Sequence, residues 1–567
     1  METAYAIAAL GYDYIIVGAG SAGCILANRL TEDPRCRVLL LEAGPEKDLL
    51  RIRLPVAAVS LWFDPALNWG YASEPQLHCD GRRLPIPRGK LLGGSSSING
   101  MFFVRGHPQD YDHWQQLGAH GWGYNDVLPY FKSIETDWRG EGPFHGGSGA
   151  LGIARCTGEP RLVTPLMKAV KAAGYPLSSD HNGAEPEGFG LPDLNIASGR
   201  RASSAAAFLK PVLRRRNLVV ETDAHCTRIV TDKACAKGVE FLQNGQLREV
   251  RATREVILAA GAINSPQLLM LSGIGPAGEL RELGITPVAN LPGVGRNLQD
   301  HAGTGLDVRC LSPWGFEREL RLDRFALSMV RWAISGSGPA ASMPVAANAF
   351  IRTREGLDRP DLQMIVLTAS PFAKLWFPGI RKPKGQVFTI RNILLHPESR
   401  GTITLASNDP LAKPRIDFNL LASSNDRSTL RESVRIARRL FATQPLAALC
   451  GEELSPGPSV NSDDEIDAHI RKTVGTFFHP AGTCAMGNSD NAVVDSALRV
   501  RGIDCLRVVD ASVMPTLPGG NVNAPTMMIA EKASALITKQ DARIPSNNSS
   551  NRASLAAAEA ASPAQQI

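Results

Sequence analysis

One histidine lies in surroundings that suit acid–base chemistry. His479 follows two phenylalanines and precedes Pro480, at the end of an apolar segment and before a turn of small residues. Histidine has an unperturbed pKa suited to proton abstraction near neutral pH, and such catalysis typically contributes about 10²–10⁴-fold. Taken alone, a histidine in apolar surroundings is more often a hydrogen-bonded core residue. This context therefore makes His479 a candidate base that needs support from other residues.

A second polar stretch follows further along the chain. An apolar strand predicted to end in Asp510-Ala511 is a place where backbone can meet the phosphates of a cofactor. Gly519-Gly520 then frees the chain to place Asn521 ahead of a helix that we expect to begin near Pro525. A second asparagine, Asn523, lies two residues further on.

The N-terminal region carries a pattern for binding a dinucleotide. Residues 13–18 form an apolar run that predicts a buried parallel strand, and the turn over 18–23 reads Gly-Ala-Gly-Ser-Ala-Gly. A helical stretch follows over 24–30, and a second apolar strand over 37–41 ends in Glu42. Strand, glycine turn, helix, strand and acid in this order are the dinucleotide-binding fingerprint.

Each glycine of that turn meets a specific structural requirement. Gly18 permits the tight turn, Gly20 lets a pyrophosphate approach the backbone, and Gly23 lets helix and sheet pack closely. The free N–H groups at the start of the helix favour an anionic diphosphate. Glu42 can accept hydrogen bonds from a ribose diol, and its charge disfavours a 2′-phosphate, so NADP is less favoured. These elements do not distinguish FAD from NAD.

Two further segments are suited to a flat cofactor. Residues 87–100 read Pro-Arg-Gly-Lys-Leu-Leu-Gly-Gly-Ser-Ser-Ser-Ile-Asn-Gly, which is too rich in small residues to build a core. Residues 255–261 predict another buried strand that ends in small residues. In the helical segment that follows, Ser265-Pro266 indicates an N-cap with a first-turn proline. The pattern over 218–229 predicts a hairpin-like pair of strands.

With these motifs in order, the chain resembles the glucose–methanol–choline (GMC) family of FAD-dependent oxidoreductases. The resemblance covers nearly everything from Asp13 to about Lys539. Two signatures of the family are similar to residues 88–100 and 261–275 of this chain. The chain is most similar to the choline-dehydrogenase and alkanol-dehydrogenase group, which shares the sequence His-Pro-Ala-Gly-Thr-Cys-Ala-Met-Gly found here at 479–487.

The resemblance implies FAD as the cofactor. Some members attach FAD covalently through a histidine, but that place is Ile98 here, so we expect non-covalent binding. The residues implied in cofactor binding are Gly18, Gly20, Ser21, Ala22, Gly23, Glu42, Ala43, Arg88, Gly93, Gly94, Ser95, Asn99, Gly100, Met101, Cys226, Gly261, Asp510, Ala511, Asn521 and Pro525.

The resemblance also implies the reaction. A primary alcohol is oxidised to the aldehyde, with His479 as the base, Asn521 as its partner and hydride transfer to flavin N5. Asn523 is the alternative to Asn521 as that partner. The electron acceptor is a quinone, another carrier or O₂, and a lyase or decarboxylase on the same scaffold is the alternative. A choline site would need an aromatic cage. However, Trp62, Phe63, Trp69, Trp332 and Trp376 are equally explained as core or cap packing.

The predicted fold class is α/β (α+β overall), with a Rossmann-like FAD-binding domain and a second, substrate-binding domain built on an antiparallel sheet with helices. The FAD-binding domain is expected over 12–310 and again over 475–540, where the catalytic residues lie. Residues 311–474 are expected to form the substrate-binding cap, because alternating segments there indicate antiparallel strands. The composition of 541–567 indicates a disordered tail.

Composition limits the remaining possibilities. The 567 residues are 44% hydrophobic with a net charge of +6, which favours a globular protein and gives no sign of a nucleic-acid partner. The ten cysteines are spread singly, so we expect a reducing compartment. No histidine pair stands at helical spacing with an acid, so we expect no metal site. No apolar run is long enough to span a membrane, and residues 1–10 lack the basic start of a cleaved signal. We therefore expect a cytoplasmic protein, with peripheral contact to the inner membrane as an alternative.

Overall fold

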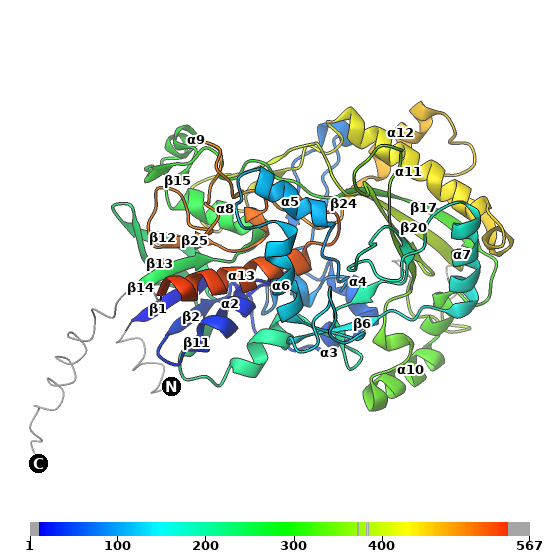
Figure 1. Cartoon of the computed structure of the whole chain (residues 1–567), viewed down its shortest axis with the longest axis horizontal. Helices are drawn as coiled ribbons and strands as arrows, with labels where there is room; N and C mark the ends of the chain where they lie inside the picture. The colour runs from blue at the N-terminus through cyan, green and yellow to red at the C-terminus, as the bar shows by residue number, and fades with distance from the viewer. Residues whose placement is uncertain (1–10, 371–372, 382, 384, 542–567) are drawn as a thin grey trace, which may run out of the picture.

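The computed structural model describes residues 11–370, 373–381, 383 and 385–541. Two seven-stranded sheets lie toward opposite ends of its long axis, with helices and long loops between and around them (Figure 1). The start over 1–10, and the predicted tail over 541–567 apart from Asp541, lie outside the described residues.

The first sheet contains the predicted Rossmann-like part. Its strand order is β11–β2–β1–β14–β13–β12, and a further strand, β25, pairs with β14. Strands β11, β2, β1, β14 and β25 run parallel, whereas β12, β13 and the first part of β14 form an antiparallel extension. The bounds are β1 (Tyr12–Val17), β2 (Val38–Leu41), β11 (Leu218–Glu221), β12 (His225–Asp232), β13 (Cys235–Gln243), β14 (Gln246–Leu258) and β25 (Leu506–Val508).

The hairpin expected over 218–229 is wrong. β11 pairs in parallel with β2, while β12 turns away and pairs antiparallel with β13. The apolar residues of 218–221 pack in the parallel sheet beside β2. Strand β11 therefore does not have to pair with β12.

Two helices from opposite ends of the chain lie together beside this sheet. Helix α2 (Gly23–Leu30) follows the glycine turn, and helix α13 (Asn523–Asp541) is close to the C-terminal end. An ion pair of 2.9 Å between Arg29 and Glu531 joins them. The last long helix therefore returns to the first one, which brings the stretch around Asn521 to the glycine turn.

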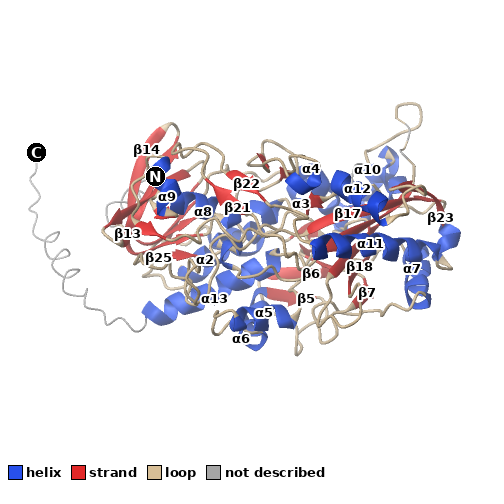
Figure 2. Ribbon diagram, turned by 90° about the horizontal axis from the view of Figure 1, so that it is seen from above, coloured by secondary structure: helices blue, strands red, loops and turns tan. Residues whose placement is uncertain are grey.

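The second sheet is antiparallel, as predicted, and lies at the other end of the molecule (Figure 2). Its order is β23–β17–β20–β19–β18–β7, with β24 paired to β17. Helices α11 (Ser424–Ala442) and α12 (Asp463–Thr473) pack against it. The strand bounds are β7 (Gly188–Gly190), β17 (Ala302–Cys310), β18 (Val345–Ile351), β19 (Leu362–Leu367), β20 (Val387–Leu394), β23 (Cys450–Ser455) and β24 (Gly475–Thr476).

Together the two sheets confirm the predicted fold class, a Rossmann-like part joined to an antiparallel sheet with helices. Strands β7 and β17 precede residue 311 in the sequence, so the second sheet takes strands from both sides of the division expected there. The domain boundaries at 310 and 474 stay predictions.

Helix α8 (Gly261–Leu271) departs from the expected start. It begins at Gly261, so Pro266 lies inside the helix and Ser265 is no N-cap. A proline has no N–H for the carbonyl four residues earlier, which here belongs to Ala262. Thr483 fills this place, because its hydroxyl donates to the Ala262 carbonyl at 2.7 Å. The segment after His479 thereby supplies the hydrogen bond that Pro266 removes from this helix. The helix borders the cavity described below.

Shorter elements connect these parts. The remaining α-helices are α3 (Leu50–Arg53), α4 (Ala58–Leu61), α5 (Pro108–Gln116), α6 (Tyr124–Ile134), α7 (Pro160–Ala172), α9 (Ala277–Glu282) and α10 (Leu322–Ser335). The remaining strands are β3 (Tyr71–Ala72), β4 (Pro85–Ile86), β5 (Glu135–Asp137), β6 (Leu151–Arg155), β8 (Asp193–Leu194), β9 (Ile196–Ala197), β10 (Arg200–Arg201), β15 (Ile274–Gly275), β16 (Ala289–Asn290), β21 (Thr402–Thr404) and β22 (Arg415–Asp417). Among the described helices, none has the length and apolar character needed to cross a bilayer.

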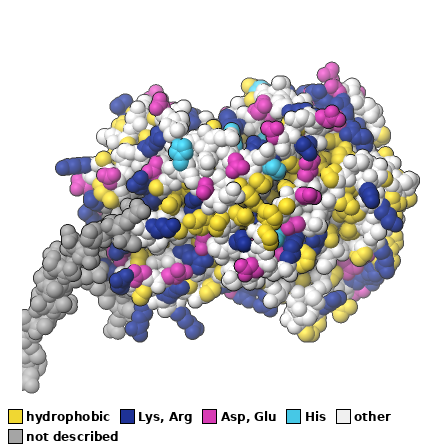
Figure 3. Space-filling model, viewed as in Figure 1, with side chains coloured by type: hydrophobic (Ala, Val, Ile, Leu, Met, Phe, Trp, Pro, Cys, Tyr) yellow, Lys and Arg dark blue, Asp and Glu magenta, His cyan; other side chains and the backbone are white. Residues whose placement is uncertain are grey.

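Basic and acidic side chains are interspersed over the face seen in Figure 3. This distribution agrees with the small net charge of +6.

Candidate functional site

A cavity of about 290 Å³ connects the first sheet to the segment around His479. One part of its wall comes from the glycine turn and the ends of β1 and β2, where Gly18, Gly20 and Glu42 lie. Another part comes from His479 and Asn521. The two patterns that the sequence places far apart therefore border the same space.

Most of the predicted cofactor residues line this cavity. They are Gly18, Gly20, Ser21, Ala22, Glu42, Ala43, Arg88, Gly94, Ser95, Asn99, Gly100, Met101, Cys226, Gly261, Asp510, Ala511 and Asn521. Gly23, Gly93 and Pro525 are not among the lining residues. Gly23 has a packing role instead, because a Cβ there would lie 1.9 Å from the Gly18 carbonyl oxygen. The contacts of these residues with a cofactor stay predictions.

The wall fits an anionic dinucleotide. A Cβ at Gly20 would meet only the Ala259 carbonyl oxygen, at 3.9 Å, so the backbone is open toward the cavity. Gly94 packs directly on the turn, since a Cβ there would lie 2.8 Å from the Cα of Gly20. The Asp510 carboxylate accepts the Gly261 N–H at 2.9 Å and fixes the start of helix α8.

Glu42 is buried at the end of β2. Its carboxylate accepts N–H groups from Ala19 at 3.0 Å and from Gly44 at 2.8 Å. Burial raises the pKa of Glu42 to about 7, although these hydrogen bonds oppose the rise. Each carboxylate oxygen can accept a second hydrogen bond, so the group remains suited to a ribose diol.

His479 lies in a chain of hydrogen bonds that determines its tautomer. The Leu395 carbonyl can only accept, so His301 donates to it from Nε2 at 3.1 Å. A neutral His301 then accepts at Nδ1 from Nδ1–H of His479, at 2.9 Å. Nε2 of His479 therefore carries the lone pair, and it accepts from the Asn521 amide at 3.1 Å. This nitrogen is able to take up a proton.

Burial keeps both imidazoles neutral. Burial, followed by the positive charge of Arg88, lowers the pKa of His479 to about 3. Burial likewise holds the pKa of His301 well below its usual value. A neutral imidazole is the form that a base requires.

Two buried polar groups position His479 and Asn521, one through the backbone of His479 and the other through the amide of Asn521. Asp300 accepts the backbone N–H of His479 at 2.9 Å. Burial raises the pKa of Asp300 to about 7, against the opposing effect of its hydrogen bond to His479. Gln363, on β19, donates to the Asn521 amide oxygen at 3.4 Å and to Asn348 at 2.9 Å. The antiparallel sheet thus orients Asn521.

The sequence left Asn523 open as an alternative to Asn521. The Asn523 amide oxygen instead accepts the hydroxyl of Ser21 at 2.7 Å, on the glycine turn. Of the two asparagines, Asn521 is the one that contacts His479. The sequence analysis did not include His301 among the candidate site residues. The available signal was its place in Asp300-His301, directly after a Gly/Asn-rich connection.

Aromatic rings lie next to His479. Trp62 lines the cavity and meets Phe478 edge to face, with ring centroids 5.7 Å apart. Trp69 also lines the cavity but stacks on Tyr71 and contacts His225. The other candidate aromatics are placed differently: Trp332 is a buried residue of helix α10, Trp376 donates to the Glu317 carbonyl, and Phe63 is exposed.

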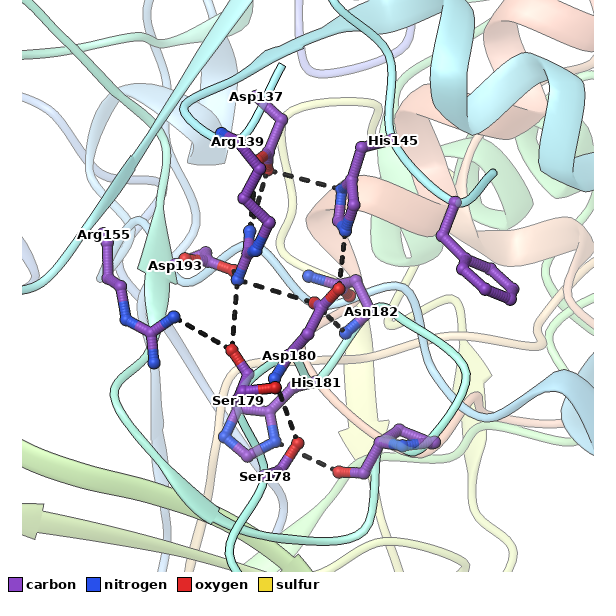
Figure 4. Close-up of polar contacts among 12 residues, drawn as sticks. Asp137, Arg139, His145, Arg155, Ser178, Ser179, Asp180, His181, Asn182 and Asp193 are labelled. Atoms are coloured by element: carbon purple, nitrogen blue, oxygen red, sulfur yellow. Dashed lines mark hydrogen bonds and ion pairs between the residues drawn. The ribbon is translucent and has the colours of Figure 1, made fainter. Parts of the chain in front are cut away.

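A second cluster of titratable groups, centred on His145, is built from other residues (Figure 4). Glu135, Asp137 and His145 have the spacing of metal ligands, but cations of the protein already contact the carboxylates. Arg105 pairs with Glu135 at 2.6 Å, and Arg139 pairs with Asp137 at 3.1 Å. The cluster is an ion-pair network in this arrangement.

Comparison with known proteins places the chain in a family. The family model of GMC oxidoreductases matches residues 12–303 with its N-terminal part and 397–530 with its C-terminal part. The mitochondrial choline dehydrogenase of Mus musculus is 42% identical over 545 residues, covering 94% of this chain and 91% of its own. The oxygen-dependent choline dehydrogenase of Vibrio vulnificus (strain YJ016) is 43% identical over 534 residues, covering 93% and 94%.

Solved structures agree with these matches. Pyridoxine 4-oxidase from Mesorbium loti is 32% identical with a TM-score of 0.83, over 93% of this chain and 99% of its own. Formate oxidase from Aspergillus oryzae is 29% identical with a TM-score of 0.87, over 94% and 98%. The fold, the cavity and these similarities define an FAD-dependent alcohol oxidoreductase. The chain belongs to the GMC oxidoreductase family.

Proposed function

We propose that this enzyme oxidises a primary alcohol to the aldehyde, with His479 as the base. The observation that carries the proposal is the lone pair of His479 Nε2, which the hydrogen bonds to His301 and Asn521 assign to a nitrogen bordering the cavity. An alcohol hydroxyl that displaces the Asn521 amide from this lone pair can give its proton to the nitrogen. FAD, when bound, supplies the two-electron acceptor for the carbon-bound hydrogen.

Asn521 and His301 support this proton transfer in different ways. The Asn521 amide can donate to the substrate oxygen as negative charge builds on it. When His479 gains a proton, its Nδ1–H still donates to His301, so the imidazolium keeps a hydrogen-bond partner inside the buried site. The backbone hydrogen bond to Asp300 fixes the position of the ring. FAD is expected to be held without a covalent link, because Ile98 lines the cavity where related enzymes carry the attaching histidine.

For the substrate, we propose choline or another primary alcohol with a quaternary ammonium group. Trp62 and Phe478 lie beside His479, and aromatic faces attract such cations. The names of the two choline dehydrogenases, at 42% and 43% identity, support the same class. Among the described residues, the acidic side chains lining the cavity are Glu42 and Asp510. Glu42 accepts the Ala19 N–H at the end of β2, and Asp510 accepts the Gly261 N–H at the start of helix α8. Recognition by aromatic rings is therefore favoured over recognition by a carboxylate.

A matched pair of alcohols tests this proposal. Choline and its uncharged analogue 3,3-dimethylbutan-1-ol have the same shape, and only choline carries a positive charge. Under anaerobic conditions we expect choline to bleach the flavin with a kcat/KM about 5–30-fold higher, as a cation–π contact of about 1–2 kcal/mol implies. Equal values would contradict recognition of the cation, whereas the absence of bleaching by any primary alcohol would contradict the oxidation itself and favour a lyase.

The electron acceptor separates two forms of this enzyme. An oxidase passes electrons from the reduced flavin to O₂, and a dehydrogenase passes them to a quinone or another carrier. We propose a dehydrogenase, a form supported by the name of the mitochondrial choline dehydrogenase, whereas the name of the oxygen-dependent enzyme of Vibrio vulnificus favours O₂ as the acceptor. Admitting air to the bleached enzyme tests this choice, because immediate return of the flavin colour with release of hydrogen peroxide would identify an oxidase.

We further propose a cytoplasmic enzyme that makes peripheral contact with a membrane through helix α10. Leu327 and Ile334 are 70% and 82% exposed, and Val330 is exposed between them on the same face. By helical spacing, Arg324 and Arg331 lie beside this face, an arrangement that suits an anionic lipid surface. In a flotation assay, we expect the protein to be recovered in the fraction that contains phosphatidylglycerol vesicles. Absence of the protein from that fraction would contradict the contact.

A further inference from the structure

A pair of cysteines lies at the edge of the first sheet, outside the cavity lining. The Sγ atoms of Cys235 and Cys505 are 3.2 Å apart, although 270 positions separate the two residues in the sequence. Both side chains are partly exposed. Neither residue takes part in the proposed alcohol chemistry.

The backbone holds the two thiols side by side. Residue 235 begins β13 and forms a parallel bridge with Asp504, the neighbour of Cys505. Hydrogen bonds from Ala236 to the Asp504 carbonyl, at 2.9 Å, and from Asp504 to the Ala234 carbonyl, at 2.7 Å, flank the pair. Because these bonds fix both chains, the sulfurs need only a small movement to reach the bond length of a disulfide, about 2.05 Å.

We propose that Cys235 and Cys505 form a reversible disulfide when the enzyme meets hydrogen peroxide. Peroxide takes two electrons from the first thiol and leaves a sulfenic acid and one water. The second thiol then attacks this sulfur, which forms the S–S bond and releases a second water. Overall, two thiols and one peroxide give one disulfide and two waters.

The surroundings indicate which thiol reacts first. The Lys237 ammonium group contacts the Cys235 thiol, and that contact raises the pKa of Lys237. A positive charge beside a thiol favours the reactive thiolate. Burial raises the pKa of Cys505 to about 11, followed in size by its hydrogen bond to Cys235. Lys237 therefore lies where it can assist oxidation of the Cys235 thiol, and Cys505, whose Sγ is 3.2 Å away, is placed to resolve the sulfenic acid.

The disulfide would tie β13 to the start of β25. Cys505 directly precedes β25, which leads within a few residues to Asp510 and the cavity. Joining positions so far apart in the chain restricts the unfolded state, so we expect the oxidised enzyme to melt at a higher temperature than the reduced one.

Mass spectrometry of the flavin-loaded full-length protein tests the proposal. Peroxide treatment should lower the intact mass by about 2 Da, remove two alkylatable thiols and produce one peptide pair joined through residues 235 and 505. Dithiothreitol should reverse all three changes. Cys235→Ser and Cys505→Ser should each abolish the mass loss, measured on variants that retain the flavin spectrum.

Cys450→Ser is the matched control. Cys450 is also partly exposed and also faces a cysteine across a strand pair, Cys310, whose thiol contacts the Ser312 carbonyl at 3.7 Å. This variant should form the disulfide like the wild type. Alkylation of both Cys235 and Cys505 after peroxide treatment, or sulfinic acid at either residue without a cross-link, would overturn the proposal. These readouts do not depend on the identity of the alcohol.

Discussion

At the scale of single residues, the site depends on the direction of three hydrogen bonds. The Leu395 carbonyl fixes which nitrogen of His301 carries the proton, and His301 in turn fixes the tautomer of His479. Asn521 then faces the remaining lone pair. The chemistry assigned to His479 therefore rests on a neighbour that its own sequence context does not reveal.

His301 is a positioning residue, and its replacement tests that role. We expect His301→Ala to slow flavin reduction by alcohol by about 10–100-fold, because Nδ1 of His479 loses the acceptor that holds the reactive tautomer. His301→Gln keeps a polar side chain and should recover part of the rate. Stopped-flow absorbance at several pH values measures both variants.

The readout for His301 separates positioning from folding. A positioning role predicts that the pH dependence of flavin reduction changes while the flavin content stays at the wild-type level. A rate unchanged in both variants would contradict the role, and loss of flavin in both would indicate a structural residue instead.

At the scale of elements, the glycine turn separates two physical roles. Gly20 faces the cavity, with the Ala259 carbonyl oxygen 3.9 Å from the place of a Cβ, whereas a Cβ at Gly23 would lie 1.9 Å from the Gly18 carbonyl oxygen. One glycine therefore leaves room for a ligand, and the other leaves room for the protein's own backbone.

Alanine substitutions test this distinction. Gly20→Ala should lower the flavin content of the purified protein while the apoprotein keeps its melting temperature, because the added methyl group points into the binding space. Gly23→Ala should lower both, because the methyl group collides with the turn. Absorbance at 450 nm and thermal melting measure the two effects. Equal flavin loss with equal destabilisation in both variants would contradict the assignment.

Much of this element-scale organisation is predictable from sequence. The glycine turn, the parallel strands and the antiparallel sheet follow from local patterns whose spacing has a direct physical meaning. The pairing of His479 with Asn521 was implied by the family resemblance. Pro266 shows the limit, because its position inside α8 depends on Thr483, more than two hundred residues away, which donates to the carbonyl that the proline leaves free. His301 escapes sequence analysis for the same reason, since its partners His479 and Leu395 come from distant segments.

At the scale of the whole molecule, two sheets enclose the site and buried ion pairs hold the intervening loops. His145 lies in such a network, with Nε2 2.7 Å from Asp180 (Figure 4). Its Nδ1 is 3.3 Å from Glu135. Burial alone would lower its pKa, but the hydrogen bonds to Asp180 and Glu135 and the nearby negative charges together outweigh it and raise the pKa to about 9. Burial alone would raise the pKa of Asp180, but its hydrogen bonds and the charges of His145 and Arg139 together lower that pKa to about 2.

This network predicts a pH-dependent stability. The folded-state pKa of His145, about 9, exceeds the unfolded value of 6.5. Its contribution to stability is fully present below about pH 6.5 and is lost as the pH rises through about 9. His145→Gln should therefore melt well below the wild type at pH 6, and the difference should shrink by pH 9.5. A melting-temperature difference that is constant or grows over this range would contradict the charged form of His145.

The most direct test of the account is the rate of anaerobic flavin reduction in His479→Ala. We expect this variant to retain stoichiometric FAD, because the glycine turn and Glu42 are unchanged, and to be reduced by choline at least about a hundredfold more slowly than the wild type. Stopped-flow absorbance of the bound flavin at saturating alcohol gives the rate. Reduction at the wild-type rate by a fully flavin-loaded variant would contradict the role of His479 as the base.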